Sequence, residues 1–257
     1  RQARVALFQN KMTDAANYAE AVLANSSFSL ASTAMDFSKN WVAGSSSPEI
    51  IFAYVNNSRA SSPLNFTLYV NDTDGSWNYA PSDWCYNSLF ADDNTLSRKG
   101  DVRLKATFTS QDANRVIKYP NGTYQLAETS DYTCTPVVIS RISEMYLIKA
   151  EALGKTNGAA ALVEYMKKRY TTAPSEAAIK ALSDKEYQTL ILDERRREFY
   201  AEGMRWQDIK RTNRLELLET LDGRTYLMYY PIPQDEIDMA GTVAYPQNPG
   251  YAGYTGN

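Results

Sequence analysis

Two separated stretches with helical periodicity constrain the fold of this chain more than any other feature. In residues 2–24, alanines and larger apolar residues recur at helical spacing on either side of a break at residues 9–11. Residues 141–170 repeat this pattern, with Gly154 and Gly158 bracketing the expected turn. Alanine side chains let antiparallel helices approach closely, as in tetratricopeptide hairpins. The pattern therefore predicts a mainly α fold containing tetratricopeptide-like helical pairs.

The stretch between these pairs, residues 26–140, has a different composition. Ser, Asn, Asp and Pro are frequent, and the β-type runs are short, at residues 49–55, 65–70 and 135–140. We expect a long loop-rich insertion with a few short strands and occasional helical turns. Loops of this length inside a compact domain are usually functional.

The densest charge lies in residues 193–211, DERRREFYAEGMRWQDIKR. Ser183 and Glu186 form a capping-box pattern that begins a helix here, and Gly203 is a natural stop before a second helix. The three arginines at residues 195–197 are distributed around the helix beside glutamates. This arrangement favours structural ion pairs over a catalytic constellation or a nucleic-acid stripe.

The composition of the chain argues against several classes of function. The chain has no histidine, which removes His-based triads, His metal ligands and the usual near-neutral proton shuttle. The net charge of −3 gives no broad surface for nucleic acid, and no apolar run approaches membrane-spanning length. Cys85 and Cys134 fit no metal spacing; free core thiols are favoured over a disulfide between them. We therefore expect that this protein is not an enzyme. The distant alternative is a glycosidase that uses a pair of carboxylates.

The strongest binding signal is residues 66–90, where seven of 25 positions are aromatic. Flat aromatic rings beside polar side chains suit the apolar faces and hydroxyl rims of sugars. The competing interpretation is that these rings fold back to anchor the loop. A calcium site at Asp72 and Asp74 stays open, although no complete calcium-loop pattern is present. The candidate ligand-binding residues are Asp74, Trp77, Asn78, Tyr79, Trp84 and Tyr86.

Several segments, in order, carry a family resemblance. Residues 137–153 (VVISRISEMYLIKAEAL), residues 190–213 (LILDERRREFYAEGMRWQDIKRTN), residues 229–238 (YYPIPQDEID) and residues 247–251 (QNPGY) are similar to the C-terminal half of SusD/RagB nutrient-binding lipoproteins. Family members are usually about twice as long and begin with a lipidated cysteine. We therefore expect this chain to be part of a longer protein, with its lipid anchor outside it.

The resemblance implies one domain over residues 1–257. Within it, residues 26–140 would face the ligand, residues 141–219 would form the helical scaffold, and residues 220–257 would pack on that scaffold. It also implies a surface location on the bacterial outer membrane, an oligosaccharide ligand captured without chemistry or a required cofactor, and a SusC-like TonB-dependent transporter as partner. Two alternatives remain: a peptide-binding relative of the same architecture, and a helical-repeat protein-interaction module.

Overall fold

The computed structural model describes residues 1–42, 46–55, 81–108, 116, 118, 136–218, 221–240 and 246–252. The chain divides into two compact units, Arg1–Met204 and Arg205–Asn257. The expected single domain, with residues 220–257 packed on the scaffold, stays a prediction. The following predicted features lie outside the described residues: Asp72, Asp74, Trp77, Asn78, Tyr79, Cys134 and the strand at residues 65–70.

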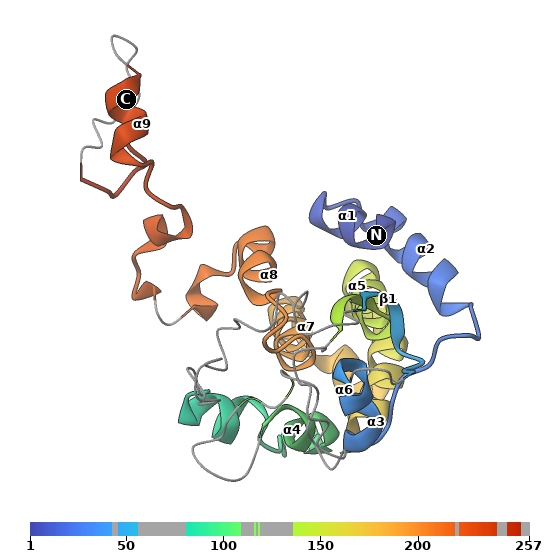
Figure 1. Ribbon diagram of the computed structural model, residues 1–257. Helices are drawn as coiled ribbons and strands as arrows, with labels where there is room; N and C mark the ends of the chain where they lie inside the picture. Colours follow the sequence, from blue (N-terminus) through green and yellow to red (C-terminus); the bar gives the residue numbers. More distant parts are fainter. Residues whose placement is uncertain are drawn as a thin grey trace. The chain divides into compact units, whose positions relative to one another are not determined.

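Helices dominate the described chain, as expected (Figure 1). The α-helices are α1 (Gln2–Phe8), α2 (Met12–Leu23), α3 (Ala34–Ser38), α4 (Val102–Thr107), α5 (Ile142–Arg169), α6 (Glu176–Ala181), α7 (Asp184–Glu198), α8 (Arg205–Thr212) and α9 (Gln234–Met239). The shorter helices are η1 (Lys39–Trp41), the π-helix η4 (Cys85–Leu89), η6 (Leu215–Leu217) and η8 (Thr225–Met228). The strands are β1 (Ile50–Tyr54), β2 (Lys99–Asp101), β3 (Val137–Arg141) and β4 (Tyr170–Thr172).

Both predicted helical pairs are confirmed. Helices α1 and α2 are separated by a turn in which Asn10 takes a left-handed backbone conformation, with φ of 57°. Helix α5 folds back at Gly154, and the Tyr146 hydroxyl donates a 2.9 Å hydrogen bond to Glu164 in the returning half. Gly158 lies against the Ala150 carbonyl, where a Cβ atom would be only 2.2 Å from that oxygen. Glycine is required there for close packing rather than for the turn.

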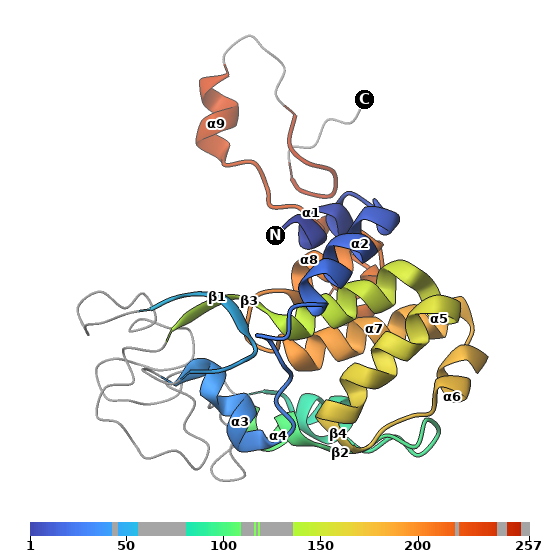
Figure 2. The same ribbon diagram turned by 90° about the vertical axis from the view of Figure 1, so that its right-hand side faces the viewer.

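The N-terminal unit is built in helical layers. Helix α2 packs on α5, and α5 packs on α7 (Figure 2). The buried alanines of α1 and α2 meet Ile142, Met145 and Ile148 of α5 in one cluster. A second cluster joins the two halves of α5 to α6 and α7. Apolar faces at helical spacing thus form the core that the sequence predicted.

Short strands attach the insertion to this helical core. Strand β1 pairs antiparallel with β3, placing Ile50 opposite Arg141 and Tyr54 opposite Val137. These are the runs expected at residues 49–55 and 135–140. The pairing of β2 with β4 was not expected, because each strand is only three residues long and lacks a β-type run.

Helix α7 begins at the predicted capping box, where Ser183 and Glu186 bond each other's backbone amides. It ends at Glu198, earlier than the expected stop at Gly203. Ala201 and Gly203 both adopt positive φ, so the chain turns over several residues after the helix. No helix of the described residues has the length and apolarity needed to cross a bilayer.

Candidate functional site

Trp84 is the candidate ligand residue that the structure places on the surface. It immediately precedes the π-helix η4, and 40% of it is exposed. The helix itself is anchored, because Cys85 and Leu89 are buried in a cluster with Phe90. Cys85 is a free thiol, and burial raises its pKa. Single π-helical turns are frequent at functional sites.

Tyr86 faces that cluster instead. Its ring meets Phe108 edge-on, with ring centroids 6.0 Å apart, and Phe108 in turn packs against Phe90 and Tyr200. Tyr86 is partly buried, so it shows the anchoring role that was the competing interpretation of these aromatics. A ligand contact by Tyr86 stays a prediction, as do those of the four candidates outside the described residues.

Two neighbouring arginines of α7 hold this segment. The Arg197 side chain is buried, and its Nε atom donates a 2.5 Å hydrogen bond to the Leu89 carbonyl at the end of η4. The Arg196 guanidinium lies over the Trp84 ring, 4.5 Å from its centroid. The charged segment of α7 therefore fixes both ends of the stretch that presents Trp84. Such a cation–π contact at an exposed site favours this placement of the ring by roughly 0.5–1 kcal/mol.

Behind this surface lies a buried ionic network centred on Glu198. Its carboxylate accepts hydrogen bonds from Arg103 at 3.2 Å, Arg141 at 2.5 Å and Arg169 at 2.9 Å. The Tyr165 hydroxyl adds a fourth donor residue at 2.8 Å. Burial opposes ionisation of Glu198, but the three guanidinium groups outweigh it and hold the carboxyl pKa well below its usual range.

The network balances its charges. Each arginine also reaches a second carboxylate: Arg103 bonds Glu194, and Arg141 and Arg169 share Glu49. Among the described residues, the network contains five cations and five carboxylates: Arg103, Lys118, Arg141, Arg169, Arg197, Glu49, Asp101, Glu194, Glu198 and Glu202. Buried charges are tolerated when they are paired and hydrogen-bonded in this way. The expectation of structural ion pairs at residues 193–211 is confirmed.

Lys118 occupies an unusual position in this network. Its ammonium donates to the carbonyls of Glu198 and Tyr200 and to the Glu202 carboxylate, and lies 4.3 Å from the ring centroid of Trp41. Burial lowers its pKa to about 8, although Glu202 acts in the opposite direction. The lysine ties the insertion to the turn after α7.

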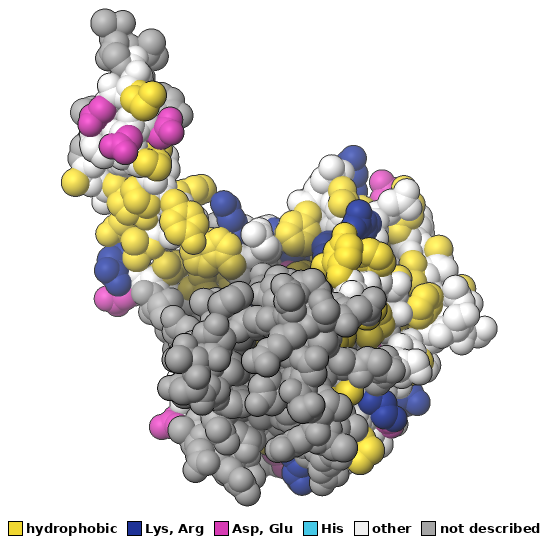
Figure 3. Space-filling view, in the orientation of Figure 1, with side chains coloured by type: hydrophobic (Ala, Val, Ile, Leu, Met, Phe, Trp, Pro, Cys, Tyr) yellow, Lys and Arg dark blue, Asp and Glu magenta, His cyan; other side chains and the backbone are white. Residues whose placement is uncertain are grey.

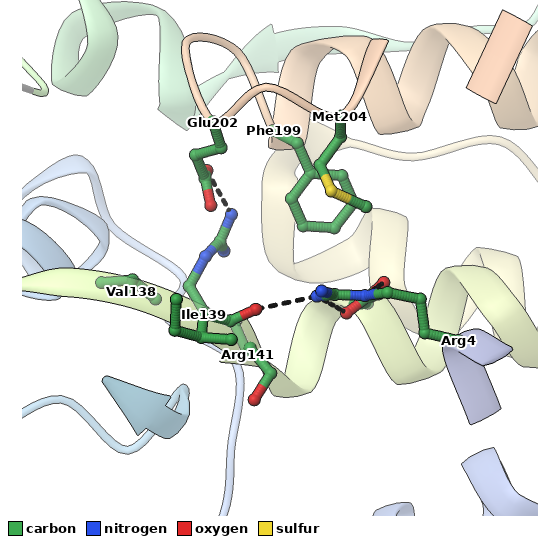
Figure 4. A pocket seen from close by; sticks show the side chains of 9 residues that line it. Arg4, Val138, Ile139, Arg141, Phe199, Glu202 and Met204 are labelled. Atoms are coloured by element: carbon green, nitrogen blue, oxygen red, sulfur yellow. Dashed lines mark hydrogen bonds and ion pairs between the residues drawn. The ribbon is translucent and has the colours of Figure 1, made fainter. Parts of the chain in front are cut away.

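A small recess opens beside the network (Figure 4). Figure 4 shows Arg4 reaching the Ile139 carbonyl while Arg141 points toward Glu202. The cavity volume is about 30 Å³, enough for a water molecule. Ligand pockets usually measure roughly 300–1,000 Å³. This recess is therefore too small for a sugar ring, and Arg4 serves to fasten α1 to Glu144 of α5.

Metal binding finds little support in the part of the chain that the structure describes. It contains no group of three His, Cys, Asp or Glu side chains placed to hold a metal ion. The alternative calcium residues Asp72 and Asp74 lie outside that part, so this alternative stays untested.

Sequence reasoning missed the partners that make the charged helix structural. Glu49, Arg103, Arg141 and Arg169 come from four distant segments, and no local spacing signals their convergence. The contact between Arg196 and Trp84 was missed for the same reason, since 112 positions separate the two residues.

Comparison with known proteins places this architecture in a family. The model of the SusD family matches residues 90–224, more than half of the chain. SusD-like protein P38 from Formosa agariphila is 30% identical over 142 residues, which cover 50% of this chain and 27% of that protein.

Solved structures share the fold. Surface glycan-binding protein A from Bacteroides thetaiotaomicron superposes with a TM-score of 0.65 at 22% identity, covering 97% of this chain and 62% of that one. A laminarin-binding SusD-like protein gives a TM-score of 0.60 at 22% identity, covering 97% of this chain and 61% of that one. The chain thus spans less than two thirds of each of these relatives. By the family match and the shared helical fold, the chain belongs to the SusD family.

Proposed function

We propose that this protein binds an oligosaccharide without chemically changing it, with Trp84 as one face of the binding site. The observation that carries the proposal is an exposed tryptophan in cation–π contact with Arg196 in a SusD-family chain. Two relatives of the same fold are a laminarin-binding protein and a surface glycan-binding protein.

The chemistry of the surface suits this ligand class. A sugar ring presents a face of C–H groups that stacks on an indole, while its hydroxyls need nearby donors. Arg196 supplies such donors next to the ring, because a guanidinium has five N–H groups and this one lies 4.5 Å from the Trp84 ring centroid. Trp77 and Tyr79, with Asn78 and Asp74, would extend the platform from the adjoining stretch of the insertion.

The wider role follows from the family. We infer that the protein acts on the bacterial outer surface as a lipid-anchored protein. There it would pass its ligand to a SusC-like TonB-dependent transporter. The proposed binding needs neither catalysis nor a cofactor. The alternative to cofactor-free binding is a calcium ion held by Asp72 and Asp74.

Calorimetric titration tests the proposal. The protein is titrated with neutral β-glucan, α-glucan and mannan oligosaccharides and, separately, with short peptides. We expect micromolar to millimolar binding of one glycan class, weakened at least tenfold in Trp84→Ala and also weakened in Trp77→Ala. Tyr18→Ala, which removes another exposed aromatic from α2, is the matched control and should bind normally. Binding of peptides but no glycan by folded protein would replace the proposal with the peptide-binding alternative.

A further inference from the structure

The C-terminal unit carries exposed aromatic side chains that the proposed site does not use. Trp206 of α8 is 36% exposed, Tyr229 is 56% exposed and Tyr230 is 88% exposed. Figure 3 shows hydrophobic side chains gathered over this unit and acidic side chains clustered over α9. Large exposed aromatics that are grouped rather than scattered commonly mark interaction sites.

The backbone behind these rings is fixed by polar side chains from the end of the chain. Gln247 accepts a 2.6 Å hydrogen bond from the Ile232 amide and donates one of 2.8 Å to the Ile232 carbonyl. Asn248 donates to the Tyr230 carbonyl at 2.8 Å, and the Tyr251 hydroxyl donates to the Tyr229 carbonyl at 2.6 Å. The segment that carries the two exposed tyrosines is therefore held before any ligand arrives, which lowers the entropy lost on binding.

A cation accompanies the aromatic side chains. Lys210 is four residues after Trp206 on α8, so the two side chains share one exposed face of the helix. The Lys210 ammonium lies 5.0 Å from the ring centroid of Tyr229. Lys210 is thus a helical neighbour of Trp206 and a direct contact of Tyr229.

Three polar groups of this surface have no ion-pair or hydrogen-bond partner among the described residues. Arg211 and Arg214 of the same unit pair with Asp208 and Glu216, whereas no carboxylate of the described chain pairs with Lys210. The Trp206 indole N–H and the Tyr229 hydroxyl likewise have no hydrogen-bond partner among the described residues.

We propose that Trp206, Lys210 and Tyr229 form a second saccharide-binding surface, whose ligand is a uronate-containing acidic glycan. The rings would stack on the C–H faces of the sugar, and the ammonium would pair with the uronate carboxylate. A purely apolar partner would leave the ammonium and both polar ring groups unsatisfied. Figures 1 and 2 place α9, with its three carboxylates, at the opposite end of the unit from α8, which carries Lys210.

This inference rests on the proposed function only in taking a glycan as ligand, and one experiment separates the two. The full chain is titrated with oligogalacturonate, alginate and hyaluronan oligosaccharides, each beside its carboxyl-reduced neutral counterpart. We expect at least one uronate to bind at least fivefold more tightly than its neutral counterpart. Raising the salt concentration should weaken that binding, because the charge pair is exposed.

Variants assign the binding to the surface. Tyr229→Ala and Lys210→Met should each weaken uronate binding at least fivefold, and Lys210→Met should also abolish the preference over the neutral counterpart. Lys185→Met, which removes an exposed lysine from α7, is the matched control and should change neither. Circular dichroism of each variant verifies folding.

The Trp84→Ala variant distinguishes failure of the second surface from failure of the proposed function. Uronate binding that survives Trp84→Ala and is lost in Tyr229→Ala supports the second surface. Uronate binding that is lost in Trp84→Ala and unchanged in Tyr229→Ala overturns this inference and leaves the proposed function intact. If no uronate binds while a neutral glycan binds at Trp84, the second surface is again refuted. If no saccharide of either class binds folded protein, both proposals fall.

Discussion

Replacing Glu198 by glutamine tests whether the buried ionic network holds the N-terminal unit together. The carboxylate accepts from Arg103, Arg141 and Arg169 and from the Tyr165 hydroxyl, all within 3.2 Å. Glutamine keeps the volume but removes the charge and turns an NH₂ group toward at least one donor. Three buried guanidinium groups would then lose their common partner.

The expected loss is large. Breaking a buried ion pair by changing one partner costs about 3–5 kcal/mol. In a unit of this size, each kcal/mol lowers the melting temperature by about 2–4 °C, so the fall should be about 6–20 °C. Glu20→Gln is the matched control, because Glu20 pairs with Lys149 at the surface and is largely exposed. An exposed pair contributes about 1 kcal/mol or less.

Urea unfolding followed by far-ultraviolet circular dichroism measures the free energies of unfolding of Glu198→Gln and Glu20→Gln, each relative to wild type. The acid dependence gives a second readout. The depressed pKa of Glu198 stabilises the fold above the ordinary glutamate pKa of about 4.3, and this contribution disappears as pH falls through the folded-state pKa. The difference between wild type and Glu198→Gln should therefore narrow in acid. A Glu198→Gln variant as stable at pH 7 as Glu20→Gln would refute the reasoning.

Three further predictions concern other positions. Lys118 has a folded-state pKa of about 8, below its unfolded value of about 10.4, so wild type should gain about 1 kcal/mol of stability relative to Lys118→Met between pH 7 and 9. The same difference in the free energy of unfolding between the two proteins at both pH values, measured by urea titration, would contradict this. Gly158→Ala should lower the free energy of unfolding by more than about 3 kcal/mol, because its Cβ would meet backbone. Gly154→Ala should cost about 1–3 kcal/mol, because its backbone (φ 65°, ψ 174°) lies in a region that essentially only glycine adopts, while a Cβ there would meet nothing within 4 Å. Thermal melts that reverse this order would show the close contact at Gly158 to be wrong. Gln247→Ala should increase amide hydrogen exchange at Ile232 at least tenfold, and unchanged exchange would show that Gln247 does not hold this segment.

Much of the helical scaffold could be read from sequence. The alanine spacing in α1 and α2 and the capping box of α7 are local patterns, and local patterns set local backbone preferences. The run at residues 49–55 likewise predicted β1. The end of α7 was predicted to within two residues, since the helix was expected to run to Phe199 and Tyr200 before the stop signal at Gly203 and ends at Glu198, ahead of the turn at Ala201.

The candidate site, like the scaffold, could be predicted only in part from the sequence. Sequence alone identified the aromatic stretch that includes Trp84, the absence of histidine and the family-like charged segment, because composition and spacing are properties of the chain itself. The tertiary structure decided that Tyr86 packs inward, that Arg196 lies over Trp84 and that Glu198 gathers arginines from three other segments. Those contacts join residues up to 112 positions apart. Burial and charge pairing select them only when the helices pack, and no local pattern encodes which distant partners will meet.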